Sequence, residues 1–340
     1  MVARPLCGGP RRCSHVRNHA ATVLSWRVPR TVEELLADVD SGERPDFLRL
    51  AKLAVELTGF GSPTEPLSAV SRHYEKRGNR AELRELLTEI FGNKQTATPT
   101  HALIARAARH HLSRAPAAAE RHYCILTTNY DSLMEAALSA ERVPFVVLTT
   151  RGDDGLVCAS FGGDLPGGAE LEAHNGPAPP GDFLLDLPGD LRLTILYKMH
   201  GSLDATVDRE VDSVVISDRD YVRFIARMWG EAMGVIPAEV SRVMERNEFL
   251  FLGYSLRDWN VRGIFEKVLE SRKFKDEELV DYTVVNAITE YDEAFLDHSV
   301  QVLRTDLNAF VAEIEAREPR PGGERREVGG TLQGTQGEGG

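Results

Sequence analysis

Between residues 31 and 118 the apolar positions recur every three or four residues, which is the period of an amphipathic helix. The pattern predicts helices over 45–57, 67–76, 81–92 and 100–112. A further helix is predicted to begin at Thr31, because Glu34 follows three residues later, as in a capping box. We therefore expect residues 31–118 to form a helical subdomain.

From residue 119 the pattern changes to short, nearly continuous apolar runs rich in Val, Ile, Leu and aromatic residues. Such runs are typical of strands buried on both faces of a parallel sheet. They lie at 122–129, 144–150, 192–201, 212–217, 248–255 and 281–287. Helical patterns at 131–141, 219–233 and 259–272 separate several of them. This alternation predicts an α/β fold over 119–316, with a doubly wound, Rossmann-like parallel sheet into which the helical subdomain is inserted.

Three segments lack both patterns. Residues 1–30 contain no Asp or Glu, no periodicity and no recognisable strand, so we expect an aberrant or disordered segment there. Residues 151–190 are rich in Gly, Pro and Asp, which indicates a long excursion between strands of the core. Residues 317–340 are rich in Gly, Arg and Glu, a composition typical of a disordered tail.

Charge and cysteine spacing narrow the function classes. The formal net charge is −12, whereas binding to a polyanion needs a surplus of Lys and Arg, so we expect no general nucleic-acid binding. A local basic patch stays open. No apolar run is long enough to span a bilayer, and no secretory signal is clear, so the cytoplasm is the expected setting. The four cysteines (Cys7, Cys13, Cys124 and Cys158) include no CxxC pair, which supports neither a disulfide framework nor a zinc ribbon.

Polar residues follow the ends of several predicted strands, where the ligands of doubly wound sheets bind. In the run "ILTTNYDSL" a strand ends at Thr127 and Thr128, and Asn129 and Asp131 come before a helix that starts near Ser132. Asp131 alone is explained equally well as the N-cap of that helix. Capping does not explain the Thr-Thr-Asn beside it.

A second strand end brings His200 and then Gly201, where the backbone can turn sharply or approach a ligand. Histidine exchanges protons near neutral pH, although a single histidine is more often structural than catalytic. Lys198 stands two residues earlier and would share the face of His200 in a strand, unless it is only a flanking charge.

A third and a fourth strand end carry weaker signals. Gly253 and Ser255 precede a helix that opens near Asp258, which suits phosphate oxygens, and capping by Ser255 or Asp258 is the alternative. Asn286 follows a predicted buried strand and would suit hydrogen bonding to a ribose or adenine, but asparagine is also a common turn former.

Taken in chain order, the motifs "TTNYD", "MHG", "LGYSLRD" and "VVN" resemble those of the sirtuin-like family of NAD-consuming domains, especially the bacterial branch that hydrolyses NAD in defence against phage. The resemblance covers about residues 120–310. It implies that Asn129 positions the attacking nucleophile at the nicotinamide ribose, and that His200 contacts the ribose hydroxyls as a base or electrostatic partner. The other implied nucleotide-binding residues are Thr128, Asp131 near the carboxamide, Gly253 and Ser255 at phosphate or ribose, and Asn286 on the adenosine side. Asn129, His200 and Ser255 are expected to converge on one crevice.

The resemblance implies an NAD glycohydrolase that releases nicotinamide and ADP-ribose, with NAD as the substrate and no metal. Deacetylase members of the family usually carry a four-cysteine zinc ribbon, which the cysteine spacing here does not permit. The alternatives are an NAD-dependent protein deacylase and a non-catalytic nucleotide-binding sensor. An unregulated NAD hydrolase would harm its host, so we expect control by homo-oligomerisation or by an activating partner protein.

The N-terminal glycine loop of the family, Gly-Ala-Gly-x-Ser, is not matched. Gly8 and Gly9 are poor substitutes, because Pro10 lacks an N–H group and two bulky arginines follow. Our hypothesis is that residues 1–30 are translated in a wrong reading frame that joins the true frame near Thr31. A Gly-Ala-Gly-x-Ser sequence in another frame of the upstream DNA would support it. If residues 1–30 are genuine, a nucleotide sensor becomes the stronger alternative.

Overall fold

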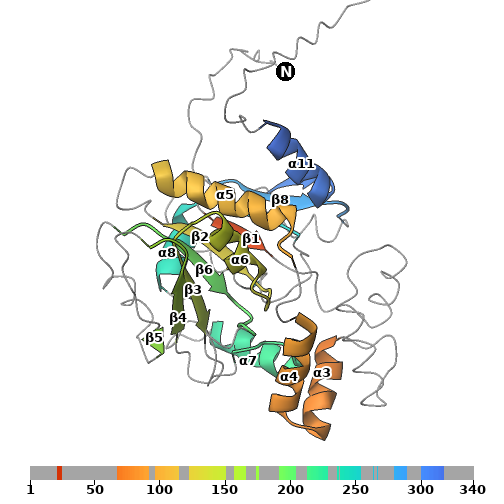
Figure 1. Cartoon of the computed structure of the whole chain (residues 1–340). Coiled ribbons are helices and arrows are strands. Elements are labelled where there is room, and N and C mark those ends of the chain that lie inside the picture. Colours follow the sequence, from red (N-terminus) through yellow and green to blue (C-terminus); the bar gives the residue numbers. More distant parts are fainter. Residues whose placement is uncertain are drawn as a thin grey trace, which may run out of the picture.

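Nine strands of the described residues form a single mixed sheet in a computed structural model of the chain (Figure 1). The structure describes residues 21–24, 67–91, 96–114, 122–150, 157–165, 174–175, 191–203, 213–228, 236, 238–253, 263, 266, 279–288 and 300–317. The strand order is β5-β4-β3-β6-β2-β1-β7-β8-β9. The strands are β1 (Ala21–Leu24), β2 (Tyr123–Thr127), β3 (Phe145–Thr150), β4 (Val157–Gly162), β5 (His174–Asn175), β6 (Thr194–Lys198), β7 (Phe249–Leu252), β8 (Asp281–Val285) and β9 (Val300–Arg304).

Helices cover both faces of this sheet. The described helices are α3 (Leu67–Arg77), α4 (Arg80–Phe91), α5 (Pro99–Arg114), α6 (Leu133–Ala140), α7 (Asp218–Met228), α8 (Ala238–Arg246) and α11 (Leu307–Arg317). Helices α5, α6 and α11 pack their apolar side chains on one face, and α7 and α8 pack on the other. The predicted α/β fold with a Rossmann-like, mainly parallel sheet is confirmed.

The chain order of the strands fixes where a ligand of this sheet would bind. All neighbouring strands from β3 to β9 in the sheet order are parallel. At the other end of the sheet, β4 pairs antiparallel with β3, and β5 pairs antiparallel with β4. The chain passes from β1 to β2 on one side and later returns to β7 on the other side of β1. This reversal makes a topological switch point at the carboxyl ends of β1 and β7, the usual ligand position in doubly wound sheets.

The expectation of no strand within residues 1–30 is wrong. Ala21–Leu24 form β1 at the centre of the sheet, paired with β2 and β7. Four residues suffice there because neighbouring strands on both sides supply hydrogen bonds, but so short a run gives almost no sequence signal. The remainder of this segment lies outside the described residues, as do all of 31–66 and 318–340, so the reading-frame hypothesis and the domain boundaries stay predictions.

Two further expectations need correction. The excursion at 151–190 is not wholly outside the core, since β4 and β5 extend the sheet and Ala159 of β4 is buried. Residues 213–216, predicted as part of a strand, join no strand of the described sheet, and the Val215 N–H donates instead to the carbonyl of His200 in a turn (2.9 Å). The helix predicted at 259–272 lies almost entirely outside the described residues.

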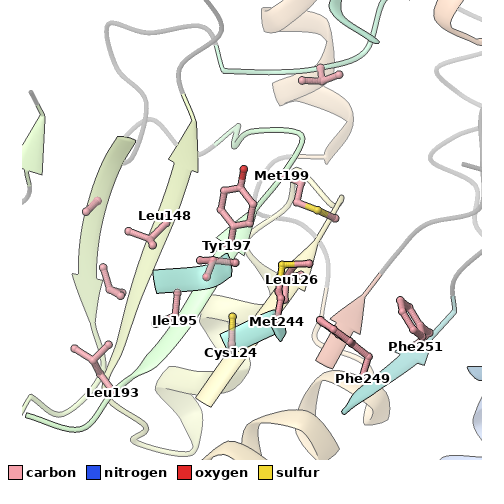
Figure 2. Packing of buried hydrophobic residues seen from close by; sticks show 14 of the residues in the cluster. Cys124, Leu126, Leu148, Leu193, Ile195, Tyr197, Met199, Met244, Phe249 and Phe251 are labelled. Carbon is pink, nitrogen blue, oxygen red and sulfur yellow. The ribbon is translucent and has the colours of Figure 1, made fainter. Parts of the chain in front are cut away.

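The core on the α7–α8 face is built from alternate residues of the central strands. Figure 2 shows side chains of β2, β3, β6, β7 and α8 in this cluster, including Cys124, Tyr197 and Met244. Phe249 and Phe251 of β7 stack on each other with ring centroids 5.6 Å apart. Full burial raises the pKa of the Cys124 thiol to about 12, so this cysteine stays a neutral thiol at physiological pH.

The helices predicted within 31–118 take two positions. Helix α5 packs directly on the sheet, where Ile104, Ala105 and Ala108 join the core under α6. Helices α3 and α4 lie at one end of the sheet beside α7 (Figure 1). A separate small hydrophobic cluster joins these two helices to the segment after His200. Tyr74 and Tyr130 pack against this cluster, whose buried members are Leu83, Leu87, Leu203, Val214 and Ile216.

Candidate nucleotide site

The residues predicted to bind a nucleotide come just after one row of paired residues that crosses the sheet. In this row Lys198 of β6 pairs with Thr127 of β2, Thr127 with Leu24 of β1, Leu24 with Leu252 of β7, and Leu252 with Val284 of β8. Since these strands are parallel, their next residues emerge at one edge of the sheet. Adjacent strands lie about 4.8 Å apart, so β6 to β8 spans roughly 19 Å, a length suited to an extended ligand.

Asn129 and His200 emerge at neighbouring strand ends. Each stands two residues beyond the register pair Thr127–Lys198, and the Met199 N–H donates to the Thr127 carbonyl (2.8 Å). Val215 ties the two corners together, because it donates its N–H to the His200 carbonyl (2.9 Å) and accepts from the Tyr130 hydroxyl (2.8 Å). The structure therefore brings the two predicted catalytic residues to the same corner of the sheet edge.

The side chain of Asn129 is buried, and among the described residues its oxygen has no hydrogen-bond partner. Asn129 is 8 % exposed, and its Oδ1 has no partner within the described part of the chain. The backbone is nevertheless held, since the Asn129 N–H donates to Thr127 Oγ1 (3.0 Å). Leaving a buried polar atom unpaired costs about 1–3 kcal/mol, so such an atom calls for an explanation. A ligand hydroxyl or a water would supply the missing donor.

His200 is held by aromatic side chains of α7. The imidazole is buried and meets Tyr221 and Phe224 edge to face, with ring centroids 5.5 and 5.8 Å away. These edge contacts restrict the orientation of the ring. The expectation that Lys198 shares the face of His200 is wrong, because β6 ends at Lys198 and the chain then turns. Lys198 reaches α6 on one face of the sheet, and His200 packs on α7 at the other.

Gly201 makes that turn possible. Its φ of +84° lies in the left-handed region, and a Cβ built there would stand 2.3 Å from the Ser213 carbonyl oxygen. We expect Gly201→Ala to lower the free energy of unfolding by about 2–5 kcal/mol, the sum of backbone strain and overpacking. Chemical denaturation measures this loss. Gly78→Ala is the control, because the only severe contact there is with the flexible Glu82 side chain. Equal stability of both variants would contradict this account of the turn.

The buried corner also contains Thr128 and Asp131. Asp131 Oδ1 accepts the Leu133 N–H (3.0 Å) at the start of α6, but the N-cap position is Ser132, so the alternative of Asp131 as the N-cap is wrong by one residue. Thr128 is buried beside Asn129. Their predicted nucleotide contacts stay predictions.

The other predicted binding residues lie farther along the edge. Gly253 directly follows β7 with φ of +63° and is partly buried, at the switch point beside β1. Asn286 follows β8 and is exposed to solvent. Ser255 lies outside the described residues, so its predicted convergence with Asn129 and His200 stays a prediction.

Comparison with known families assigns this arrangement. A family model described as SIR2-like domain matches residues 123–299, which is more than half of the chain. The chain belongs to the SIR2-like domain family. Comparison with curated proteins gives no match. SIR2-like domains use NAD as substrate, and the matched span includes the strand ends that carry Asn129, His200 and Gly253.

The SIR2-like domain contains a buried ion pair that the sequence analysis missed. Lys198 is fully buried, and its Nζ lies 2.6 Å from Oε1 of Glu135 on α6. The sequence analysis considered Lys198 as a neighbour of His200 or as a flanking charge, and it did not single out Glu135. A signal was present, since Glu135 interrupts the apolar face formed by Leu133, Met134, Ala137 and Leu138. A carboxylate on a buried helix face needs a cation, and Lys198 ends a fully buried strand.

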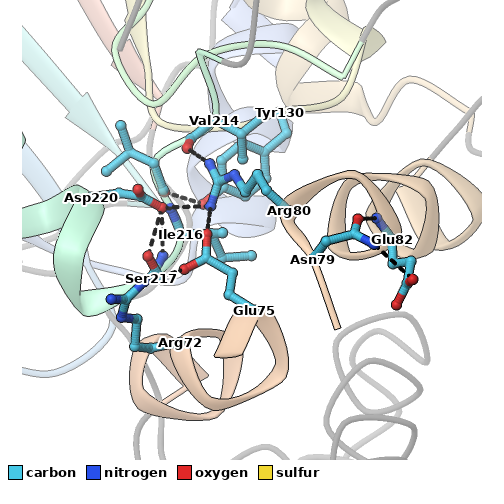
Figure 3. Close-up of polar contacts among 11 residues, drawn as sticks. Arg72, Glu75, Asn79, Arg80, Glu82, Tyr130, Val214, Ile216, Ser217 and Asp220 are labelled. Atoms are coloured by element: carbon cyan, nitrogen blue, oxygen red, sulfur yellow. Dashed lines mark hydrogen bonds and ion pairs between the residues drawn. The ribbon is translucent and has the colours of Figure 1, made fainter. Parts of the chain in front are cut away.

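Helices α3 and α4, which precede the matched span, are joined to the site by Arg80 (Figure 3). Arg80 Nη1 lies 2.8 Å from both Glu75 Oε1 and Asp220 Oδ2, and Nη2 donates to the Val214 carbonyl. Asp220 also accepts the Ser217 N–H (2.9 Å) at the start of α7. The helix pair therefore supports the segment that holds His200.

Two observations bear on other ligands of the SIR2-like domain. Within the described ranges, no group of three or more His, Cys, Asp or Glu side chains is arranged to hold a metal ion. None of the described helices has the length and apolarity needed to cross a bilayer.

Proposed function

We propose that this SIR2-like protein hydrolyses NAD to nicotinamide and ADP-ribose. The proposal rests mainly on the buried amide oxygen of Asn129, which has no hydrogen-bond donor in the described part of the chain. Asn129 and His200 follow the ends of the neighbouring strands β2 and β6. A ribose hydroxyl or an attacking water is a donor of the required kind. Family membership makes NAD the substrate to consider first.

In this proposal the chemistry is a substitution at the anomeric carbon of the nicotinamide ribose. The bond to nicotinamide breaks with its electron pair on the leaving nitrogen, and the oxygen of water forms the new bond and loses a proton. The transition state is oxocarbenium-like, as in other glycoside hydrolysis. Asn129 orients the water or the adjacent ribose hydroxyl, and His200 takes up the proton, a step that contributes about 10²–10⁴-fold.

The remaining assignments belong to the same proposal. Thr128 and Asp131 lie near the nicotinamide end, Gly253 and Ser255 at the phosphates or ribose, and Asn286 at the adenosine. The spread from β6 to β8 supports a ligand with two separated ends, such as a dinucleotide. We place the activity in the cytoplasm of a bacterium as a phage-defence effector, because the motifs resemble that branch of the family.

An NAD-dependent deacylase is the competing function, and Cys124 bears on it. A zinc ribbon needs thiolate ligands, whereas burial raises the pKa of Cys124 to about 12 and keeps it protonated inside the core. This cysteine therefore packs as an apolar side chain, which favours hydrolysis over a ribbon-containing deacylase.

Purified full-length protein incubated with NAD separates these functions. We expect equal amounts of nicotinamide and ADP-ribose to form without any peptide, and an acetylated peptide to leave the rate unchanged. Release that depends on the peptide would establish the deacylase instead. NAD binding without any release would identify a nucleotide sensor. A homo-oligomer or an activating partner is expected to raise the rate, so the assay is repeated across protein concentrations.

A further inference from the structure

We propose that Lys198 is a positioning residue, which fixes the corner that presents Asn129 by holding the backbone carbonyls of Tyr130 and Asp131. The inference rests on the proposed function, because it assigns a role at the same site. It differs from a structural ion pair in one respect. The important partners of Lys198 are the two carbonyls, and Glu135 is the counter-charge that allows an ammonium group to be buried there.

The contacts of Lys198 converge on that corner. Its Nζ donates to the Asp131 carbonyl (2.5 Å), to the Tyr130 carbonyl (3.4 Å) and to Glu135 Oε1 (2.6 Å). An ammonium group has three N–H donors and no acceptor, so these three partners use its full capacity. The side chain is fully buried at the end of β6, which leaves it little freedom to move.

The two carbonyls held by Lys198 belong to the residues directly after Asn129. The same corner is held by the Leu203 N–H on the Tyr130 carbonyl (3.1 Å) and by the Asn129 N–H on Thr127 Oγ1 (3.0 Å). None of these bonds uses the Asn129 side chain, whose Oδ1 has no partner in the described ranges. Lys198 therefore anchors the backbone on one side of Asn129 and leaves the amide oxygen for a ligand.

Stability is a weak explanation for a charge pair at this depth. The desolvation of two buried charges offsets much of the stabilisation from their attraction. Proteins in which apolar side chains replace such a pair are often as stable or more stable. Burial also raises the pKa of Glu135, an effect that the contact with Lys198 opposes, and Glu135 Oε2 has no partner among the described residues. An apolar pair would fill this space at no electrostatic cost, but it would not hold the two carbonyls.

The decisive variant replaces both charges with apolar side chains, Lys198→Met with Glu135→Leu. Single Lys198→Met leaves Glu135 buried without a cation, so it is expected to lower the melting temperature strongly. The double variant is expected to regain most of that loss. Its kcat for nicotinamide release is expected to stay about 10²-fold below wild type, with KM for NAD changed much less, because a displaced catalytic group costs about that factor.

Arg109→Met is the control, since it breaks an ion pair with Glu141 in which the Arg109 side chain is 60 % exposed. It is expected to leave the melting temperature and kcat unchanged.

Hydrogen exchange of residues 127–133 gives a readout that does not depend on catalysis. In the double variant the amide hydrogens of this segment are expected to exchange faster than in wild type. The exchange of β6 and of the rest of α6 is expected to be unchanged. Recovery of kcat together with the melting temperature, or unchanged exchange at 127–133, would overturn the positioning role. If wild-type protein releases no nicotinamide, the proposed function fails, and the exchange experiment alone decides whether Lys198 fixes this corner.

Discussion

Replacing Asn129 with alanine is expected to lower nicotinamide release by at least about 100-fold, the loss typical of a removed orienting group at a reacting centre. The same change is expected to leave the free energy of unfolding within about 1 kcal/mol of wild type, because the buried Oδ1 has no partner to lose in the described part of the chain. Loss of activity without loss of stability is the signature of a group kept for a ligand. Initial rates with NAD and a thermal melt measure the two effects.

The matched control for this variant is Asn308→Ala on α11. Asn308 is exposed on α11, which follows the edge strand β9, and β9 lies four strands from β2 in the sheet order. Neither rate nor melting temperature should change in the control. A clear fall in stability for Asn129→Ala, with release intact, would mean that Asn129 is a packing residue.

Replacing His200 with alanine is expected to lower kcat by about 10²–10⁴-fold, the contribution of a positioned acid–base group. Alanine also removes the edge-to-face contacts with Tyr221 and Phe224, so this variant is expected to lose about 1–3 kcal/mol of stability. The more informative variant is His200→Phe, which keeps an aromatic ring in the same pocket and cannot accept a proton. It should be folded and as inactive as the alanine variant.

His110→Ala controls for the loss of a histidine elsewhere, because His110 is exposed on α5, which covers the sheet away from α7. It is expected to behave as wild type. Retention of NAD hydrolysis by His200→Phe would show that the imidazole has only a packing role, and the proposed proton acceptor would have to be sought elsewhere in the chain.

The parts of the fold that were predictable are those with a strong local pattern. Strands β2, β3, β6, β7 and β8 coincide with predicted apolar runs, because a parallel strand buried on both faces must be apolar throughout. Strand β1 was missed, since its four residues acquire a strand conformation from two neighbours distant in sequence. The segment 213–216 failed in the opposite way. Val214 and Ile216 are buried against α4 and the segment after His200, although residues 213–216 join no strand of the described sheet.

Within the site, the sequence indicated which residues end the strands but not where each side chain would lie. Asn129 and His200 were identified because they follow strand ends, where the ligands of doubly wound sheets bind, and because the family resemblance implied their roles. The register then brings them together. Lys198 could not be placed correctly, because its orientation depends on β6 ending at that residue. Its pairing with Glu135 depends on α6 lying over the end of β6, which is a tertiary contact.

The most direct test of the central claim is a crystal structure of the full-length protein with ADP-ribose bound. We expect one nucleotide to lie across the carboxyl ends of β6, β2, β1 and β7, with Asn129 Oδ1 accepting a hydrogen bond from a ribose hydroxyl and His200 contacting the same sugar. A nucleotide bound elsewhere, or an Asn129 oxygen paired with another part of the chain while ADP-ribose is bound, would contradict it.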